Sequence, residues 1–309
     1  MPLSMETKTG EFSRVIQLFS GKSGGKTSFP LVGLSVREAG GRTSVSVSHK
    51  SKTDDAALKA EWFGVSSEAG TAFDVATDQP DRLLDYLSNV FAPESPIKVA
   101  YDADAKRLVV HDGRRRASMG TVAFDSVLRP KPDEFGAAPS GSWVTSRPDR
   151  RPSAPANTEW AGWVAAGYTV ASIPLTALGE MLKAGAVLYG HNYKGIVYNF
   201  TVHPDGLEVH IGDTKNPDAE SVHMDRLDGA TVFPGVGEET FAVRYGTVGP
   251  LWEPLHLVQS GALTLVHHPS EQRINFLASE DAADGTPILR LTESFMSWAD
   301  PKANRPAKK

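Results

Sequence analysis

The sequence predicts an α+β protein made of two tandem copies of one module, in which two helices pack on antiparallel sheets. Three observations predict this class. Both halves of the 309-residue chain open with a helical pattern that leads into a hairpin, their elements keep the same spacing, and a proline-rich stretch separates them. Each copy therefore has to bury its own apolar face by folding helices onto a sheet.

The first copy begins with apolar residues at helical spacing, Phe12, Val15, Ile16 and Phe19. The strand-like segment PLVGLSVRE, a Gly-Gly turn and the alternating segment TSVSVSHK then predict a hairpin. A strand over 71–75 leads into a second helix, whose apolar face is formed by Leu83, Leu84, Leu87 and Val90. Further strands are predicted in PIKVAYDADAKRLVVHD and RRRASMGTVAFD.

The second copy repeats this order. PLTALGEMLKAG predicts its first helix, and IVYNFTVHPDGLEVHIGD predicts a hairpin with Asp-Gly in the turn. A strand over 240–243 precedes a second helix, which is predicted from Leu251, Trp252, Leu255 and Val258. From Phe12 to Leu34 there are 22 positions (34 − 12), as from Leu178 to Phe200 (200 − 178). The shared spacing favours a duplication over a chance likeness of two α+β patterns.

Residues 128–165 interrupt the pattern, because proline, serine, glycine and alanine dominate there and no period is sustained. We therefore expect four parts: domain 1 over 1–127, a connector over 128–167, domain 2 over 168–298, and a polar basic tail over 299–309. Tryptophan is unusual in a free linker, so parts of the connector should pack against the body. The tryptophans concerned are Trp143, Trp160 and Trp163.

Composition argues against several classes of protein. The net charge of −5 argues against a uniformly basic surface, and the absence of cysteine excludes disulfides and thiolate metal sites and fits a reducing compartment. No apolar run approaches the ~20 residues that a membrane span needs, and the N-terminal segment has no apolar signal core. We expect a cytoplasmic protein that does not contact membranes.

One segment resembles a phosphate-binding loop. FSGKSGGKTS ends with the required Gly25, Lys26 and Thr27, but Ser20 stands where that loop opens with glycine. The segment also follows a predicted helix and precedes a predicted strand, the reverse of the order that such a loop needs. We interpret it as a flexible connection between helix and strand.

The histidines do not form a recognisable metal site. Adjacent side chains on a strand point to opposite faces, so His267 and His268 are not expected to share an ion. His203, His210 and His223 are scattered among strands without a fixed carboxylate partner. No catalytic set, metal or cofactor is predicted, and the protein is not expected to be an enzyme.

The chain resembles the DNA polymerase sliding clamps over residues 11–127 and 168–297, in the order and length of its modules and in patterns such as LTALGEMLKAG…GIVYNFTVHPDGLEVHIGD. The resemblance implies a non-catalytic processivity factor that encircles duplex DNA and tethers the replicative polymerase. Two modules per chain imply a homotrimeric ring, with a polymerase and a clamp loader as partners through short peptide motifs. The Ala-, Gly- and Arg-rich composition would suit a phage of a high-GC bacterium, acting in the host cytoplasm. The connector is longer than the clamps have.

The resemblance also implies where DNA would be contacted. A clamp slides, so its contacts should reach phosphates without reading bases. Basic residues on the helices and their exits are the candidates, and each could instead be an ordinary solvated charge diluted by nearby acids. The candidates are Arg14, Lys22, Lys26, Arg82, Lys183 and Arg244.

Two protein interfaces are implied as well. Edge strands of neighbouring chains should pair, with Arg114, Arg115 and Arg116 opposite Glu220 and Asp225. The same arginines could form a solvated basic turn or bind DNA directly. Partner peptides should dock in an apolar pocket formed by Val127, Leu128, Ile288 and Leu289.

Two other functions fit the same pattern. A ring-forming structural protein of a phage virion or tail would also be a duplicated, β-rich module, but its tube would be lined by sheets. A small-molecule enzyme would need a deep pocket with convergent polar groups. A positively charged channel lined by helices would favour the clamp.

Overall fold

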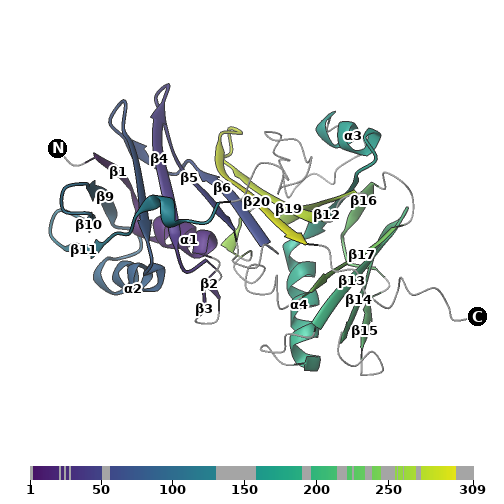
Figure 1. Cartoon of the computed structure of the whole chain (residues 1–309). Helices are drawn as coiled ribbons and strands as arrows, with labels where there is room; N and C mark the ends of the chain where they lie inside the picture. The colour runs from purple at the N-terminus through teal and green to yellow at the C-terminus, as the bar shows by residue number, and fades with distance from the viewer. Residues whose placement is uncertain are drawn as a thin grey trace, which may run out of the picture. The chain divides into compact units, whose positions relative to one another are not determined.

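The computed structural model describes residues 3–20, 22–23, 26–27, 29–50, 56–129, 158–189, 196–213, 221–224, 226–233, 239–244, 255, 257–259, 261–268 and 273–296. The chain forms two compact units (Figure 1). Unit 1 comprises Met1–Lys131, Pro250–Val258 and Ser279–Thr292, and unit 2 comprises Pro132–Gly249, Gln259–Ala278 and Glu293–Lys309. Unit 1 therefore includes two segments from the second half of the sequence.

The described part of unit 1 contains two α-helices, two larger antiparallel sheets, a small two-stranded sheet and one short 3-10 helix. In chain order its elements are β1 (Leu3–Lys8), α1 (Thr9–Ser20), β2 (Lys22–Ser23), β3 (Lys26–Thr27), β4 (Val32–Ala39), β5 (Arg42–Lys50), β6 (Ala56–Trp62), β7 (Ser66–Ser67), β8 (Ala72–Thr77), α2 (Pro80–Val90), β9 (Pro96–Asp102), β10 (Arg107–His111), β11 (Arg116–Gly120) and the short helix η1 (Phe124–Ser126). One sheet has the order β11-β10-β9-β1-β7, and the other contains β6-β5-β4-β8.

The two sheets exchange their first strands. β1 pairs with β9, with Met5 opposite Val99, although β1 leads into the helix that precedes β4. In return β8 pairs with β4, with Val75 opposite Leu34. Unit 1 is thus two interlocked β-α-β-β-β halves. The helices pack against each other, and Phe12 of α1 stacks on buried Trp62 with ring centroids 6.3 Å apart.

Local sequence explains these elements. α2 begins at Pro80, a residue well suited to a first helical position, and it buries Leu83, Leu84 and Leu87 on one face. The β4–β5 hairpin turns through Gly40 and Gly41, whose positive φ angles of 62° and 80° match a two-residue hairpin turn that favours glycine.

Unit 2 has the same strand pairing. Its elements come from α3 (Thr158–Ala165), β12 (Thr169–Pro174), α4 (Leu175–Tyr189), β13 (Ile196–His203), β14 (Gly206–Asp213), β15 (Val222–Met224), β16 (Thr231–Phe233), β17 (Glu239–Arg244), β18 (Ala262–His267), β19 (Arg273–Asp281) and β20 (Pro287–Met296). The last two strands are divided between the units, because the segment Ser279–Thr292 belongs to unit 1. One sheet is β15-β14-β13-β17, and the other contains β16-β12-β18-β19. α4 lies close to the first sheet, because a Cβ on Gly185 would stand 2.5 Å from the Tyr198 hydroxyl.

The duplication is confirmed by topology. β12 pairs with β16 and β18 as β1 pairs with β7 and β9, and β13 pairs with β14 and β17 as β4 pairs with β5 and β8. Corresponding elements begin at similar offsets: 166 positions separate Leu3 from Thr169 (169 − 3), 164 separate Val32 from Ile196 (196 − 32), and 171 separate Arg116 from Pro287 (287 − 116). The predicted α+β class, with helices packed on antiparallel sheets, is therefore confirmed.

Three parts of the prediction need comment. Each copy was expected to open with a helix, which is wrong, because β1 and β12 come first. Of the predicted helix near 251–258, Leu255 and Val258 are described and buried, whereas Leu251 and Trp252 lie outside the described residues. Within the segment predicted as a connector, 158–165 forms α3, and 130–157 lies outside the described residues, including Trp143.

α3 is held by an apolar cluster within unit 2. Trp163 is buried together with Tyr168, Val170, Val266 and Leu277. None of the helices in the described ranges is long and apolar enough for a membrane crossing.

Candidate nucleic-acid and partner interfaces

The outward faces of the helices are nearly balanced in charge. Among the described residues of α2, Arg82 and Asp85 are exposed charges of opposite sign. The exposed charges described on α4 are Glu180 and Lys183. α1 has no fully exposed residue at all. The described helices therefore do not present a strongly positive surface.

Arg82 is available to an external partner. Its Nε donates a hydrogen bond to the Tyr86 hydroxyl at 2.8 Å, one turn further along α2, and one of its terminal nitrogens donates to the Gln79 side-chain oxygen at 3.2 Å. The guanidinium also lies 5.4 Å from the centre of the Tyr86 ring. These neutral contacts orient the side chain and leave its charge without a carboxylate partner among the described residues.

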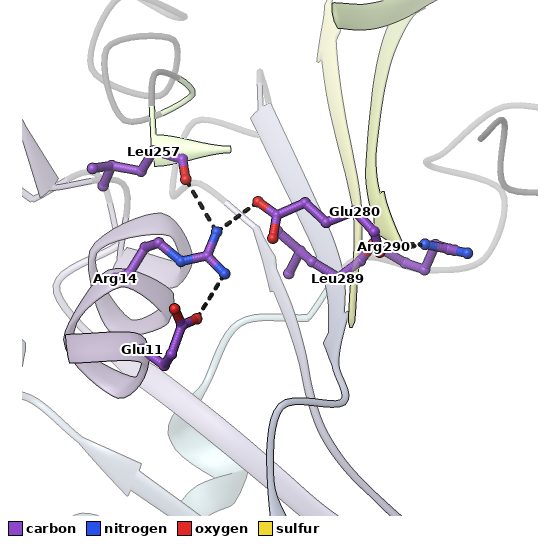
Figure 2. A network of polar contacts seen from close by, with 6 residues as sticks. All are labelled: Glu11, Arg14, Leu257, Glu280, Leu289 and Arg290. Carbon is purple, nitrogen blue, oxygen red and sulfur yellow. Dashed lines mark hydrogen bonds and ion pairs between the residues drawn. The ribbon is translucent and has the colours of Figure 1, made fainter. Parts of the chain in front are cut away.

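Arg14 does not fit the DNA interface that the sequence suggested for it. Its side chain is only 11% exposed, and one terminal nitrogen lies 2.5 Å from a carboxylate oxygen of Glu280 (Figure 2). The same nitrogen donates to the carbonyl oxygen of Leu257 at 3.1 Å, and the other terminal nitrogen lies 2.9 Å from Glu11. All three partners belong to unit 1. The guanidinium is thus occupied by structural contacts.

A second arginine extends this polar network. Arg290, also buried, donates to the carbonyl oxygens of Glu280 and Leu289, and pairs with Asp281 at 2.5 Å. Burial alone would lower the pKa of the Arg14 guanidinium, but hydrogen bonding and charge from Glu280 and Glu11 outweigh it and raise that pKa. Charges this deeply buried persist only with such partners, so the network fixes 279–292 against α1.

The remaining predicted DNA contacts are only partly described. Lys22 and Lys26 belong to a small hairpin in which Lys22 pairs with Thr27 and Ser23 with Lys26. The chain leaves α1 at Ser20 and returns at Phe29, whose N–H donates to the Ser20 carbonyl at 3.0 Å. This order, helix then strand, is the reverse of a phosphate-binding loop.

Side-chain positions are known for only one of the other candidates. Lys183 is exposed on α4. Arg244 ends β17 opposite Val197, and its side chain lies outside what is described, as do those of Lys22 and Lys26. These four residues stay predicted DNA contacts.

β11 and β15 are among the strands that occupy sheet edges. β11 is an end strand of the sheet β11-β10-β9-β1-β7 in unit 1, and β15 is an end strand of the sheet β15-β14-β13-β17 in unit 2. Both are the strands from which pairing between chains was predicted. Glu220 and Asp225, which flank β15, lie outside the described residues.

The backbone of β11 is partly free. Thr121 donates to Lys106, and Asp112 donates to Arg115, at the two ends of the β10–β11 pair. Since hydrogen-bonded pairs alternate in an antiparallel ladder, Arg116, Ser118 and Gly120 direct their N–H and C=O groups away from β10.

Arg115 serves the turn before β11. Asp112 accepts the backbone N–H groups of Arg114 and Arg115 at 2.9 and 2.7 Å and also pairs with the Arg115 guanidinium at 2.7 Å. These contacts, led by the Arg115 N–H, lower the pKa of Asp112 to about 2. Arg115 is therefore engaged within its own turn.

The predicted peptide pocket is not formed as a single site. Lys50 donates its N–H to the Leu128 carbonyl, whereas Phe63 donates to that of Ile288. Lys50 lies opposite Ala57 on β6, and Ala57 is six residues from Phe63, roughly 20 Å in a strand. Val127–Leu128 and Ile288–Leu289 therefore sit at opposite ends of the β5–β6 pair, so the prediction that these four residues converge is wrong.

The histidines do have carboxylate partners, which sequence spacing did not show. His203 and His223, on β13 and β15, lie 3.0 and 3.5 Å from the two oxygens of Glu208 on β14. His267 lies 2.5 Å from Glu239 in the interior. No group of three or more ligands arranged for a metal ion occurs in the described part of the chain.

Comparison with known proteins identifies the fold only. No protein-family model and no curated protein matches the sequence. This chain is similar to a chain in the structure of the C-terminal region of FEN-1 bound to A. fulgidus PCNA, with a TM-score of 0.59 and 11% identity. The match covers 96% of this chain and 98% of the other chain. A structure from Eubacterium rectale assigned as a DNA polymerase III beta subunit also matches 96% of this chain, with a TM-score of 0.59 and 7% identity, but only 65% of that chain is covered. The fold is clamp-like.

Proposed function

We propose that this protein is a sliding clamp, a non-catalytic processivity factor that encircles duplex DNA and tethers a replicative polymerase. The duplicated module carries the proposal. Two copies with exchanged first strands and the same order of elements match clamp-like structures over nearly the whole chain. The composition adds a phage origin with action in the host cytoplasm, and the resemblance noted from the sequence adds contacts with a polymerase and a loader.

Ring formation is supported by two of the sheet edges, those of β11 and β15. β11 and β15 are different strands, so pairing β11 of one chain with β15 of the next is a head-to-tail contact. Head-to-tail contacts form a ring when their rotation closes, and two modules per chain lead us to propose three chains. One outward carbonyl, that of Ser118, already accepts a hydrogen bond from Arg107 at 3.2 Å, so the pairing has to share or displace that bond.

DNA would be held by enclosure more than by attraction. The exposed charges of α2 and α4 nearly cancel, so phosphate contacts would be few. Arg82, Lys183 and Arg244, with Lys22 and Lys26 on the hairpin, remain the proposed contacts. Weak contacts of this kind suit a protein that must slide without reading bases.

The same charge balance favours a second candidate, a ring-forming structural protein of a phage virion or tail. Such a protein would assemble into rings without any need to retain duplex DNA. The two candidates therefore agree on assembly and differ on DNA.

Two measurements test the proposal, one of assembly and one of retention on DNA. Light scattering should give a mass near three times 33.2 kDa, and the protein should remain on circular duplex DNA but be lost from linear DNA. A trimer without retention on circles would support the structural protein, and a stable monomer at micromolar concentration would count against both.

A further inference from the structure

A row of basic side chains crosses the solvent face of the sheet β11-β10-β9-β1-β7 in unit 1. The strand register places Lys98 beside His111 and His111 beside Arg116. Their neighbours along the strands, including Val99 and Val110, are buried on the opposite face. Because side chains alternate between the two faces of a strand, the basic side chains point away from the core on which α1 and α2 pack.

A cavity of about 350 Å³ lies at the end of this row. We call it the arginine pocket, and it is lined by Ala100, Asp102, Val109, His111, Gly113, Arg114, Arg115 and Arg116. Ala100 and Val109 are each only 6% exposed and give it an apolar floor.

The charges that line the arginine pocket are not balanced. Asp102 accepts the N–H of Ala105 at 3.0 Å, and Asp112 engages Arg115. The side chains of Arg114 and Arg116 are exposed, and neither forms an ion pair with any residue that the structure describes. Two guanidinium groups are thus free to bind an anion above an apolar floor.

We propose that the arginine pocket binds an acidic peptide segment of a partner protein, with side-chain carboxylates on Arg114 and Arg116. Arginine pairs with carboxylates through two parallel hydrogen bonds, which gives geometric specificity as well as attraction. The apolar floor of Ala100 and Val109 suits the methylene groups that a glutamate side chain carries and a phosphate lacks.

The location distinguishes this ligand from DNA and from a second copy. On the proposed function, on which this inference rests, DNA lies on the helix side, whereas the pocket opens on the opposite face of the sheet. Contact between chains would use the β11 backbone edge, while the pocket is formed by side chains on the sheet face.

The test uses a fluorescein-labelled ten-residue peptide of alternating glutamate and serine, which places its carboxylates on one side of an extended chain. Fluorescence anisotropy with the full chain should show binding that weakens as salt rises, because exposed charges are screened within ~10 Å at 0.1 M salt. The double variant Arg114→Ala/Arg116→Ala should bind about tenfold more weakly. Lys59→Ala, which removes an exposed cation from β6, should bind like the unmodified chain.

Four results would overturn the proposal. The double variant could bind the peptide as well as the unmodified chain does, or a peptide with glutamine in place of glutamate could bind equally well. The double variant could instead lose its oligomeric mass, which would assign the arginines to a second copy, or lose affinity for a 12-base-pair duplex, which would assign them to DNA. If the peptide binds through these arginines while the unmodified chain is not retained on circular DNA, the clamp function fails and the pocket stands.

Discussion

Two arginines of unit 1 look alike in the sequence and have opposite surroundings. Arg14 on α1 is buried between Glu11, Glu280 and the Leu257 carbonyl, whereas Arg82 on α2 is exposed and, within the described part of the chain, its contacts are with neutral groups. The difference arises from 250–258 and 279–292, which belong to unit 1. Segments more than 240 residues away in the sequence thus decide whether an arginine on a helix is held in structural contacts or exposed to solvent.

The largest expected effect is on stability. Arg14→Ala should destabilise unit 1 by about 3–5 kcal/mol, because it removes the Arg14 guanidinium from the buried Glu280 carboxylate. Arg82→Ala should change the free energy of unfolding by no more than about 0.5 kcal/mol. Urea denaturation of both variants measures the difference.

A second pair of substitutions sharpens this result. The variant Arg14→Met/Glu280→Leu removes both buried charges and should recover part of the loss, since the penalty comes mainly from a buried carboxylate that has lost the Arg14 charge. Equal, small effects of Arg14→Ala and Arg82→Ala would show that the network contributes no more than a surface charge.

The next effect depends on pH. Burial lowers the pKa of His49 to about 4 from its ordinary value of 6.5. Between these values the unfolded chain takes up a proton that the folded chain refuses, so stability should fall as pH drops from 6.5 to 4, by up to about 3 kcal/mol. Urea denaturation of the unmodified chain and of His49→Phe across this range should show a shallower pH dependence in the variant.

A second buried group, Glu293, also changes stability with pH, so the unmodified chain and His49→Phe have to be compared at each pH. Burial raises the pKa of Glu293 well above its ordinary value, so Glu293 acts in the opposite sense and lowers stability as pH rises above 4.5. Identical pH profiles for the unmodified chain and His49→Phe would contradict the role given to His49.

The smallest effects concern DNA affinity. Arg82→Ala and Lys183→Ala should each reduce the slope of log affinity against log salt by about 1, if each side chain neutralises one phosphate. Glu180→Ala, which removes an acid from the same helix as Lys183, should not reduce that slope. Filter binding of a short duplex over a salt series provides the measurement, and unchanged slopes for both basic residues would remove the helices from the proposed DNA interface.

The duplication could be predicted because both copies show the same local patterns of apolar residues and turns. Phe12 and Leu178, 166 positions apart (178 − 12), both begin apolar helical patterns, and the hairpins that follow have glycine turns. β1, with the sequence LSMETK, was missed because a short strand with mixed polarity pairs with β9, more than 80 residues later. Local patterns do not show a partner so far along the chain.

The candidate sites were harder to predict for the same reason. The sequence correctly indicated that Arg82 is an exposed charge on a helix, but not that Arg14 meets Glu280. It placed Val127 and Ile288 in one pocket, whereas strand register separates them. Long-range register, which no short motif encodes, decides each of these cases.

Topological retention on DNA tests the central claim most directly. A linear duplex is fixed to a bead at one end, the protein is allowed to thread from the free end, and that end is then closed by a bulky block before a high-salt wash. A sliding clamp should stay on the duplex only while the block is present and should leave when the duplex is cut. Equal retention with open and blocked ends, or none with either, would contradict the account.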